Sequence, residues 1–160
     1  MDKRNSETAP LIQLKEINAA SIPLNLLLEV DPLKSNIDKY LKGSLCFASF
    51  INDEMVGVCV TNIVADGISE VFNISIYSNY QKQGVGNKLL RFTIDQLARK
   101  NIAKIVLGTG SFGYQLMFYQ RLGFRVDSVE KTFFIDNYDN PIFENDIQHK
   151  DMLRLSLRLE

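Results

Sequence analysis

The sequence predicts a mixed α/β domain, classed in some schemes as α+β, in which hairpins are followed by crossover helices. In the first half, the turn sequences Asn52-Asp53 and ADG (residues 65–67) each lie between two apolar runs, which favours β-hairpins. In the second half, apolar runs alternate with amphipathic helical segments, and helical connections of this kind join parallel strands. Hairpins and helical crossovers together indicate one mixed sheet with helices on its faces.

Four strands and a helical segment are expected before residue 78. Residues 11–17 (LIQLKEI) form the first strand, and residues 19–41, interrupted by Pro23 and Pro32, form one or two short helices. The apolar runs SLCFASFI and EMVGVCVTNI are the strands of the first hairpin. The second turn leads into a fourth strand, SEVFNISIY, at residues 69–77.

Two helices and three strands are expected after residue 78. The first helix covers residues 86 to about 100, and its buried face contains Leu90, Ile94 and Leu97. After the strand AKIVLGT comes a second helix at about residues 113–122, followed by Gly123, which suits a left-handed C-cap. The strand FRVDSVEKTFFI, a loop containing Asn140-Pro141 and a last strand, DMLRLSLRL, complete the chain.

Length and composition indicate one domain without a nucleic-acid or membrane surface. The chain has 160 residues, enough for one substantial core, and its net charge of −1 offers no basic surface. The start of the chain, MDKRNSETAP, is polar, so residues 1–10 are expected to be a flexible tail and residues 11–160 a single domain. Apolar runs fall short of the roughly 20 residues of a membrane span, and the cytoplasm is the expected location.

Two cysteines, Cys46 and Cys59, are too few for a disulfide framework or a four-ligand zinc site. A turn centred on Asn52-Asp53 fixes the register of the first hairpin. The expected cross-strand pairs are Cys46 with Cys59, Ala48 with Gly57, and Phe50 with Met55. In a reducing compartment we expect two neighbouring buried thiols, and a reactive or redox pair is the alternative.

The stretch YQKQGVGN, residues 80–87, places two glycines where a predicted strand ends and a helix begins. A helix N-terminus carries unpaired backbone N–H groups and about half a positive charge. Gly84 and Gly86 would let a phosphate or pyrophosphate approach these amides without Cβ atoms in the way. A tight turn without a ligand is the alternative interpretation. A Walker loop and a dinucleotide fingerprint are excluded, because no GK[ST] sequence follows and Leu89 stands where a third glycine is needed.

Two motifs resemble the GCN5-related N-acetyltransferase (GNAT) family. Gln81-x-x-Gly84-x-Gly86 is similar to the acyl-CoA signature of the family, and FYQRLGF, residues 118–124, is similar to its LYEKLGF motif. The order of expected elements resembles that of the family from about residue 11 to residue 159. The resemblance implies a GNAT-like, mostly antiparallel central sheet of about six to seven strands flanked by helices.

Two other segments bear on this resemblance. The sequence GTGSFGYQ, residues 108–115, lacks the asparagine that many family members carry after the fifth strand, and Ser111 is its polar substitute. The tail sequence YDNPIFENDI, residues 138–147, resembles a group of uncharacterised acetyltransferases with a PIFEN-type motif.

The resemblance implies where acetyl-CoA would bind. Its pyrophosphate would lie on the amides of the glycine loop, with Lys82, Lys88 or Arg91 near other phosphates. In the family the fourth and fifth strands splay apart, so the pantetheine arm would pair with the backbone of residues 73–76, while the isoleucine side chains there belong to the core. The implied cofactor-binding residues are Ile74, Ser75, Ile76, Gln81, Lys82, Gln83, Gly84, Val85, Gly86, Asn87, Lys88 and Ser111.

Acetyl transfer to an amine needs a neutral nucleophile, an acceptor for its proton and a proton for the departing thiolate. The resemblance points to Tyr119 as the acid, and packing within its helix is the alternative role. Glu70 and Glu144 are candidates for the base, and each can also be an ordinary solvated carboxylate. Histidine can accept protons near neutral pH, but no motif supports His149, so a surface histidine is expected. The sequence contains no metal-ligand cluster, and no metal is expected.

The expected function is therefore acetyl-CoA-dependent N-acetyltransferase activity on a primary amine of a small molecule, or of a peptide or protein. Residues 127–151 contain seven acids and two lysines, which would favour a cationic acceptor or a solvated loop. Polyamines, aminoglycosides, amino acids and protein amines stay open. A non-catalytic acyl-CoA sensor and an assembly scaffold are the alternative functions. Acetyl-CoA and the amine are the expected partners, nucleic acid and membrane are not, and a homodimer is left open.

Overall fold

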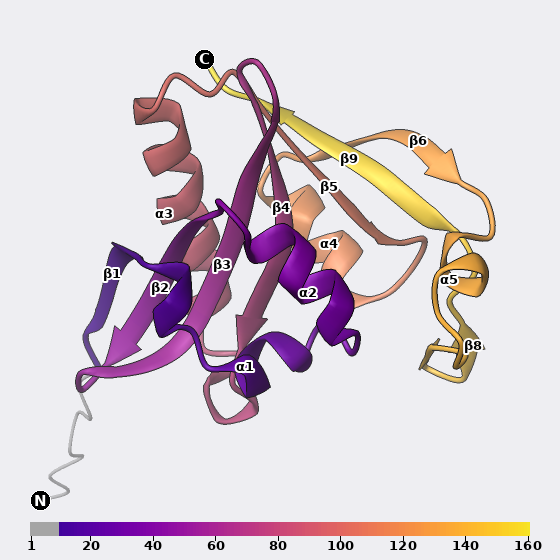
Figure 1. Ribbon diagram of the computed structural model, residues 1–160, viewed down its shortest axis with the longest axis horizontal. Coiled ribbons are helices and arrows are strands. Elements are labelled where there is room, and N and C mark those ends of the chain that lie inside the picture. The colour runs from indigo at the N-terminus through magenta and orange to yellow at the C-terminus, as the bar shows by residue number, and fades with distance from the viewer. Residues whose placement is uncertain (1–9) are drawn as a thin grey trace, which may run out of the picture.

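A seven-stranded sheet forms the centre of the computed structural model, which describes residues 10–160 (Figure 1). The strands are β1 (Ile12–Ile17), β2 (Leu45–Ile51), β3 (Glu54–Ala65), β4 (Ile68–Ile76), β5 (Lys104–Gly110), β6 (Arg125–Glu130) and β9 (Met152–Arg158). They lie in the order β1-β2-β3-β4-β5-β9-β6, and β4 and β5 are parallel whereas the other neighbours are antiparallel. The mixed, mostly antiparallel sheet is thus confirmed. The predicted tail lies outside the described residues, apart from Pro10.

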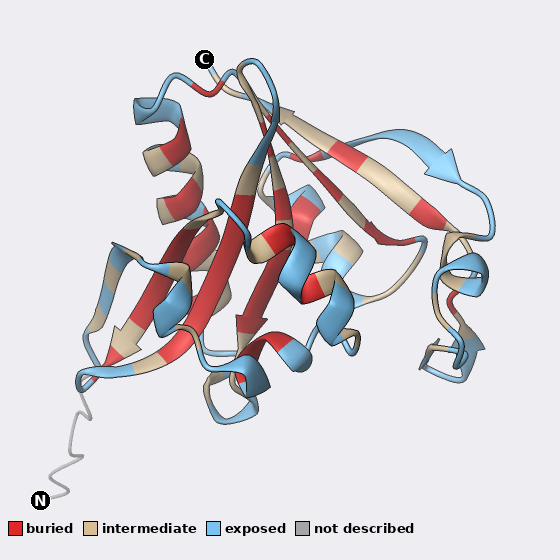
Figure 2. Ribbon diagram, viewed as in Figure 1, coloured by how far each residue is buried: buried red, intermediate tan, exposed pale blue. Residues whose placement is uncertain are grey.

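Helices cover both faces of this sheet. They are α1 (Leu24–Leu28), α2 (Lys34–Leu41), α3 (Val85–Arg99), α4 (Tyr114–Arg121) and the short α5 (Phe133–Asp136). In Figure 1, α1 and α2 lie in front of the sheet, and α3 and α4 lie behind it. The side chains of α1 and α2 pack with Cys46 and Val58, whereas those of α3 and α4 pack with Phe47 and Cys59. The sheet therefore separates two cores, and Figure 2 shows the buried residues concentrated along its central strands.

The first hairpin has the predicted turn. Asn52 and Asp53 both have positive φ angles, 51° and 62°, as a tight two-residue hairpin turn requires. Phe50 pairs with Met55 as expected. A bulge directly before this pair, next to Ser49, shifts the register of the remaining strand by one residue.

This bulge separates the two cysteines, so the prediction that they lie opposite each other is wrong. The observed pairs are Cys46 with Val60, Phe47 with Cys59, and Ala48 with Val58. Because a shift of one residue moves a side chain to the other face of a sheet, Cys46 lies in the α1–α2 core and Cys59 in the α3–α4 core. Both thiols are free and buried, and burial raises the pKa of Cys46 and raises that of Cys59 to about 12.

The predicted strand at residues 124–135 ends earlier than expected. β6 stops at Glu130, and Thr132, with a φ of 62°, turns the chain into α5. The Thr132 N–H donates a hydrogen bond to Asp151 Oδ1 at 2.9 Å, which fixes this turn beside the start of β9. Phe134 therefore belongs to a helical turn outside the sheet, although its apolar sequence favours a strand.

The predicted loop before the last strand also contains a small hairpin. β7 (Phe143–Glu144) and β8 (Ile147–Gln148) pair through Asn145 and Asp146, whose φ angles are 50° and 63°. The chain then enters β9, which lies between β5 and β6 rather than at an edge. Residues 133–149 thus lie at one end of the sheet, on the right of Figure 1.

A bulge in β4 separates this strand from β5. Phe72 has no partner on β3, between the pairs made by Val71 and Asn73. Pairing of β4 with β5 ends at the same place, with Val71 opposite Leu107. Residues 73–76 pair with β3 on one edge, and no strand in the described part of the chain pairs with their other edge. Because a bulge bends its strand, the two parallel strands splay apart here, as expected.

We predict that a thiol reagent such as dithionitrobenzoate reacts slowly with the native protein. Both thiols are buried, and their raised pKa values keep the reactive thiolate scarce. Unfolding under non-reducing conditions should release two equivalents per chain, because the sequence contains two cysteines. Cys46→Ser and Cys59→Ser should each lower this number by one. Rapid labelling of the native protein, or recovery of no free thiol on unfolding, would contradict the buried and unbridged arrangement.

Candidate active site

The glycine loop lies at the N-terminus of α3. Gly84 precedes the helix with a φ of 81°, a conformation that favours glycine, and a Cβ atom there would contact nothing within 4 Å. Gly84 is therefore required by the backbone turn. A Cβ atom on Gly86 would instead lie 3.7 Å from Ile76 Cγ1 and 3.7 Å from Phe118 Cζ. Gly86 thus leaves the first amides of the helix accessible from the space between β4 and α4.

Gln81 ties this loop to the end of β4, because its Nε2 donates a hydrogen bond to the Ile76 carbonyl oxygen at 2.9 Å. A cleft of about 520 Å³ lies between the loop, β4 and α4. Of the predicted loop residues, its lining includes Gln81, Lys82, Gly84, Gly86 and Asn87, whereas Val85 is buried in the core and Gln83 and Lys88 are exposed outside the lining.

The wall of the cleft opposite α4 is the splayed part of β4. Ile74 and Ile76 pack in the core as expected, and both also line the cleft. Ser75 faces the other side of the strand, where its hydroxyl donates to Asn73 Oδ1. Asn73 Nδ2 donates in turn to the carbonyl oxygen of Leu27 at 3.1 Å. A buried hydrogen-bond network therefore supports the strand from behind while its free edge faces the cleft.

Tyr119 of α4 lines the same cleft. Its side chain packs against the rings of Phe118 and Phe124, with centroids 5.3 and 5.8 Å away, and the residue is only 5% exposed. Burial, with a smaller contribution from Cys59, raises the pKa of the Tyr119 hydroxyl, so the phenol is protonated at neutral pH. Within residues 10–160 no group accepts a hydrogen bond from this hydroxyl. It is therefore available to donate to a ligand in the cleft.

A second hollow of about 310 Å³ adjoins the cleft, and we call it the distal pocket. The two share Val30, Tyr114 and Gln115 as lining residues. The distal pocket is formed by the connection between α1 and α2, the end of β5, the start of α4 and the segment at residues 134–149. The cleft and the distal pocket therefore lie next to each other.

Glu144 and His149 form a hydrogen-bonded pair in the distal pocket. His149 Nε2 lies 2.9 Å from Glu144 Oε1, and the Tyr114 N–H donates to Glu144 Oε2 at 3.1 Å. His149 is 7% exposed and stacks on Phe112 with centroids 4.1 Å apart, so the prediction of a surface histidine is wrong. The hydrogen bond from His149 is the largest influence on the pKa of Glu144, which lies below its ordinary value. Glu144 is therefore ionised at neutral pH.

Two glycines explain how this pair fits beside β5. A Cβ atom on Gly110 would overlap the His149 ring, and one on Gly113 would overlap the Glu144 carboxylate. The sequence GTGSFGYQ therefore leaves the volume that the two side chains occupy. Its glycine spacing is the sequence signal that could have indicated the buried pair. Ser111, the predicted polar substitute, is exposed and lies outside the linings of both hollows.

Glu70 lies apart from both hollows. Arg154 Nη2 donates to Glu70 Oε1 at 2.8 Å, and Arg154 Nη1 lies 3.4 Å from Oε2. This ion pair crosses β5 at Gly108, where a Cβ atom would lie 3.1 Å from Arg154 Nη1. The structure therefore brings Tyr119 and Glu144 to adjoining hollows but holds Glu70 in an ion pair with β9.

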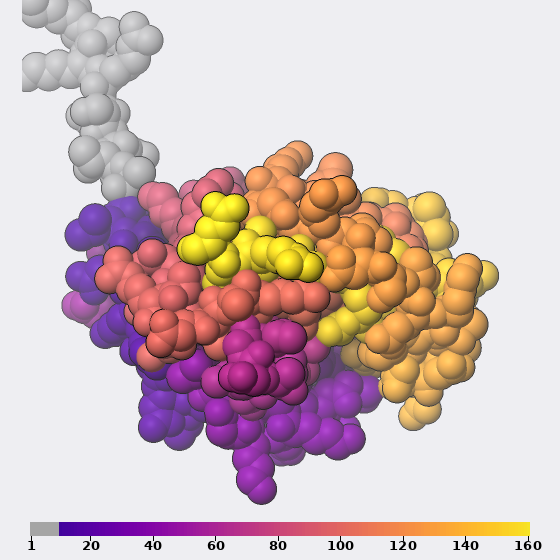
Figure 3. Space-filling view, turned by 90° about the horizontal axis from the view of Figure 1, so that it is seen from above, coloured from indigo at the N-terminus to yellow at the C-terminus, as the bar shows by residue number. Residues whose placement is uncertain are grey.

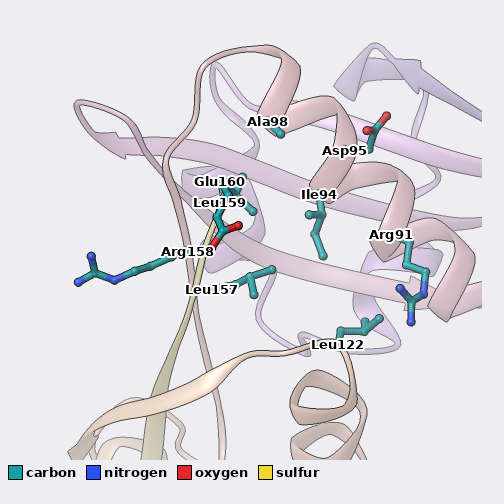
Figure 4. Close-up of a pocket in the computed structure, with 9 residues that line it drawn as sticks. All are labelled: Arg91, Ile94, Asp95, Ala98, Leu122, Leu157, Arg158, Leu159 and Glu160. Carbon is teal, nitrogen blue, oxygen red and sulfur yellow. The ribbon is translucent and has the colours of Figure 1, made fainter.

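A third hollow, of about 350 Å³, lies between α3 and the end of the chain (Figure 4). Figure 3 views the molecule from the end where the β3–β4 turn, the end of α3 and the C-terminus gather. Arg91 lines the third hollow, and its Nε donates to Asn87 Oδ1 at 2.8 Å. Because the glycine loop and Tyr119 do not line it, this hollow is not the candidate site, and Arg91 lies outside the lining of the cleft.

Two further findings concern metal ions and membranes. Within residues 10–160 no three His, Cys, Asp or Glu side chains gather in a way that could hold a metal ion. None of the helices described there has both the length and the apolar character needed to cross a membrane.

Comparison with known proteins defines the class to which this fold and site belong. The sequence pattern of the acetyltransferase (GNAT) domain matches residues 42–126. YvbK, an N-acetyltransferase of Bacillus subtilis (strain 168), is 38% identical over 136 residues, which cover 84% of this chain and 88% of that protein. The chain belongs to the GNAT acetyltransferase family.

Two solved structures extend this comparison to three dimensions. A GNAT family acetyltransferase from Elizabethkingia anophelis, with acetyl-CoA bound, has a TM-score of 0.87 and 37% identity, over 92% of this chain and 98% of its own. A Bacillus subtilis acetyltransferase in complex with CoA has a TM-score of 0.84 and 35% identity, over 95% of this chain and 100% of its own. Both share the fold of this chain over nearly its full described length.

We predict that Gly86→Glu weakens acetyl-CoA binding by about 10- to 100-fold. The substitution adds bulk and a negative charge at the place where a negatively charged phosphate would meet the helix amides. The fold should survive, since the site of the new Cβ atom is at ordinary contact distances. Ala98→Glu is the matched control, because it adds the same side chain to an exposed position of the same helix. Calorimetric titration of both variants decides the matter, and equal affinities would remove the phosphate site from α3.

Proposed function

We propose that this protein transfers the acetyl group of acetyl-CoA to a primary amine, with Tyr119 as the general acid and Glu144 as the base. One observation carries the proposal: the cleft that has the glycine loop and Tyr119 in its wall adjoins the distal pocket that contains Glu144, and the two share lining residues. A thioester in the cleft and an amine in the distal pocket would therefore react at their shared wall.

The cleft suits acetyl-CoA in three respects. The amides at the start of α3 provide donors and positive potential for the pyrophosphate, and Gly86 allows it to approach closely. The unpaired edge of residues 73–76 offers backbone groups to the two amides of the pantetheine arm, as an added strand would use them. Lys82 lines the cleft and adds a positive charge near the phosphates.

The chemistry requires two proton transfers. The amine nitrogen attacks the thioester carbon, and the proton that it loses passes to the Glu144 carboxylate and then to water, since this side chain is 36% exposed. The carbon–sulfur bond then breaks, and Tyr119 donates its hydroxyl proton to the CoA thiolate. The protonation states suit these roles, because the acid is protonated and the base is ionised at neutral pH.

His149 serves in this proposal as a positioning residue. Its hydrogen bond holds Glu144 Oε1, and the Tyr114 N–H holds Oε2, so the carboxylate is fixed at the rim of the distal pocket. Glu70 is not proposed as the base. Its carboxylate is bound by Arg154, and it lines neither hollow.

Four further features of the protein belong to the proposal. The tail motif at residues 138–147 contributes Tyr138, Phe143 and Glu144 to the distal pocket, which supports grouping this chain with acetyltransferases that have a PIFEN-type motif. Free buried thiols are typical of a reducing compartment, which supports a cytoplasmic location. Assembly as a homodimer stays open, and a single domain covering residues 11–160 stays a prediction.

The direct test is a thiol-release assay with acetyl-CoA and a broad panel of primary amines. Release of CoA together with acetylated product supports transfer. Acetyl-CoA binding without release across the whole panel would instead support an acyl-CoA sensor. Absence of acetyl-CoA binding by calorimetry would overturn both functions.

We predict that Tyr119→Phe lowers kcat by about 10²- to 10⁴-fold, the usual contribution of general acid catalysis, when thiolate departure limits turnover. Acetyl-CoA affinity should change little, because the hydroxyl is needed as negative charge develops on sulfur. Tyr77→Phe removes a hydroxyl from a tyrosine outside both linings and serves as the control. Steady-state rates and acetyl-CoA titrations of both variants provide the measurement. A folded Tyr119→Phe protein with normal turnover, and with chemistry shown to be limiting, would leave Tyr119 a packing residue only.

We predict that Glu144→Gln lowers kcat by about 10²-fold or more without weakening acetyl-CoA binding, whereas Glu70→Gln retains turnover in the fraction that is folded. The pKa of Glu144 is lowered from 4.5 in the folded protein, so the carboxylate stabilises the fold above this value and the effect disappears as the pH falls through the lowered pKa. The difference in melting temperature between wild type and Glu144→Gln should therefore close on acidification. A lower kcat for Glu70→Gln but not for Glu144→Gln would make Glu70 the base in place of Glu144.

A further inference from the structure

The charges around the distal pocket have one sign. Its lining contains two carboxylates, Glu29 from the end of α1 and Glu144 from β7. Within residues 10–160, no lysine or arginine lines this pocket. A cation inside it gains from both carboxylates, whereas an anion would meet repulsion without any opposing charge.

Much of the rest of the lining is aromatic. Five aromatic side chains besides the histidine line the pocket, and they are Phe112, Tyr114, Phe134, Tyr138 and Phe143. Aromatic faces attract cations and pack well against hydrocarbon. These ring faces offer no hydrogen-bond partners to hydroxyl groups, so a sugar-like acceptor that lay against them would lose hydrogen bonds to water. The pocket therefore favours an apolar body beside the cationic group.

Two buried polar atoms in the lining have no hydrogen-bond partner among the described residues, Thr109 Oγ1 and His149 Nδ1. Their residues are 4% and 7% exposed, and buried polar atoms are normally bonded. The Glu144 carboxylate can only accept, so in the neutral form of the His149 ring Nε2 donates to it and Nδ1 has a lone pair. Both unpartnered atoms expose less than 1 Å² of surface, so the groups that a ligand in the pocket contacts are the carboxylates and the aromatic residues of the lining.

We infer that the acceptor is a primary amine on a hydrocarbon or aromatic body that carries no anionic group. This inference rests on the proposed function and narrows it. Amino acids are disfavoured, because their carboxylate would enter a pocket that contains two carboxylates and no basic side chain in its described lining. Aminoglycosides are disfavoured by the apolar wall. Arylalkylamines and alkyl diamines share the favoured chemistry.

The test compares acceptors that differ in one group. 2-Phenylethylamine, L-phenylalanine and L-phenylalanine methyl ester present the same ring with no carboxylate, an ionised carboxylate and a neutral ester. We expect kcat/KM for the amine and for the ester to exceed that for the amino acid by about 10- to 100-fold, the effect of one like charge at close range. 1,5-Diaminopentane in the same assay distinguishes an alkyl diamine from an aromatic amine as the preferred member of the class.

Charge reversal at Glu29 tests the cause of this preference. Glu29→Lys should lower kcat/KM for 2-phenylethylamine by about tenfold and narrow its advantage over L-phenylalanine, while Glu29→Gln should give a smaller change in the same direction. Glu54→Lys, the same reversal at an exposed position outside both linings, should change neither. Acetyl-CoA titration of each variant checks that the cleft is intact.

The outcomes separate this inference from the proposed function. Turnover of L-phenylalanine or of an aminoglycoside with kcat/KM equal to or above that of the apolar amines would overturn the inference and leave acetyl transfer standing. The same holds if Glu29→Lys and Glu54→Lys behave alike. Absence of CoA release with every amine, while acetyl-CoA still binds, would overturn the proposed function and this inference with it.

Discussion

The bulge at Phe72 is the constraint on which the rest of the site depends. A regular β4 would pair with β5 along its whole length, and no cleft would separate them. The extra residue ends that pairing at Val71 and turns residues 73–76 away, which leaves one strand edge without a partner in the described chain. Unpaired backbone groups are costly inside a protein, and a ligand that pairs with this edge would satisfy them.

The splayed strand keeps its position because its other side is firmly held. Asn73 bonds to the Leu27 carbonyl and, at 2.9 Å, to the Tyr40 hydroxyl, which joins β4 to both α1 and α2. At the end of β5 the space arises in a different way. Gly110 and the nearby Gly113 have no side chains, and this makes room for His149 and Glu144. One strand therefore supplies the space by bending and the other by lacking side chains.

Local patterns in the sequence predicted the parts of the fold that local chemistry determines. The Asn52-Asp53 turn, the order of strands and helices, and the glycines before α3 follow from turn propensity, periodicity and the needs of a helix N-terminus. The bulges could not be predicted this way, because one extra residue barely disturbs an alternating apolar pattern but moves every later side chain to the other face. Cys46 and Cys59 were misplaced for this reason.

The candidate site likewise contains residues that the sequence predicted and residues that it did not. Gly84, Gly86 and Tyr119 lie in recognisable motifs, and the structure brings them to one cleft. The burial of His149 depends on two contacts. Its ring stacks on Phe112, which is far from it in the sequence, and its Nε2 lies in a hydrogen bond with Glu144, which the β7–β8 hairpin brings close. No local pattern around a single histidine predicts such contacts.

The cleft and the distal pocket come from different parts of the chain, and this affects how such an enzyme can acquire new acceptors. The GNAT pattern spans residues 42–126 and contains the glycine loop, the splayed strand and Tyr119. Much of the distal pocket comes from outside it, from residues 29–32 and 134–149. Substitution, lengthening or replacement of these two surface segments could therefore redirect the chain to a different acceptor while the machinery for the shared cosubstrate stays intact. The same sheet can in this way support enzymes that use one acetyl donor and many kinds of acceptor.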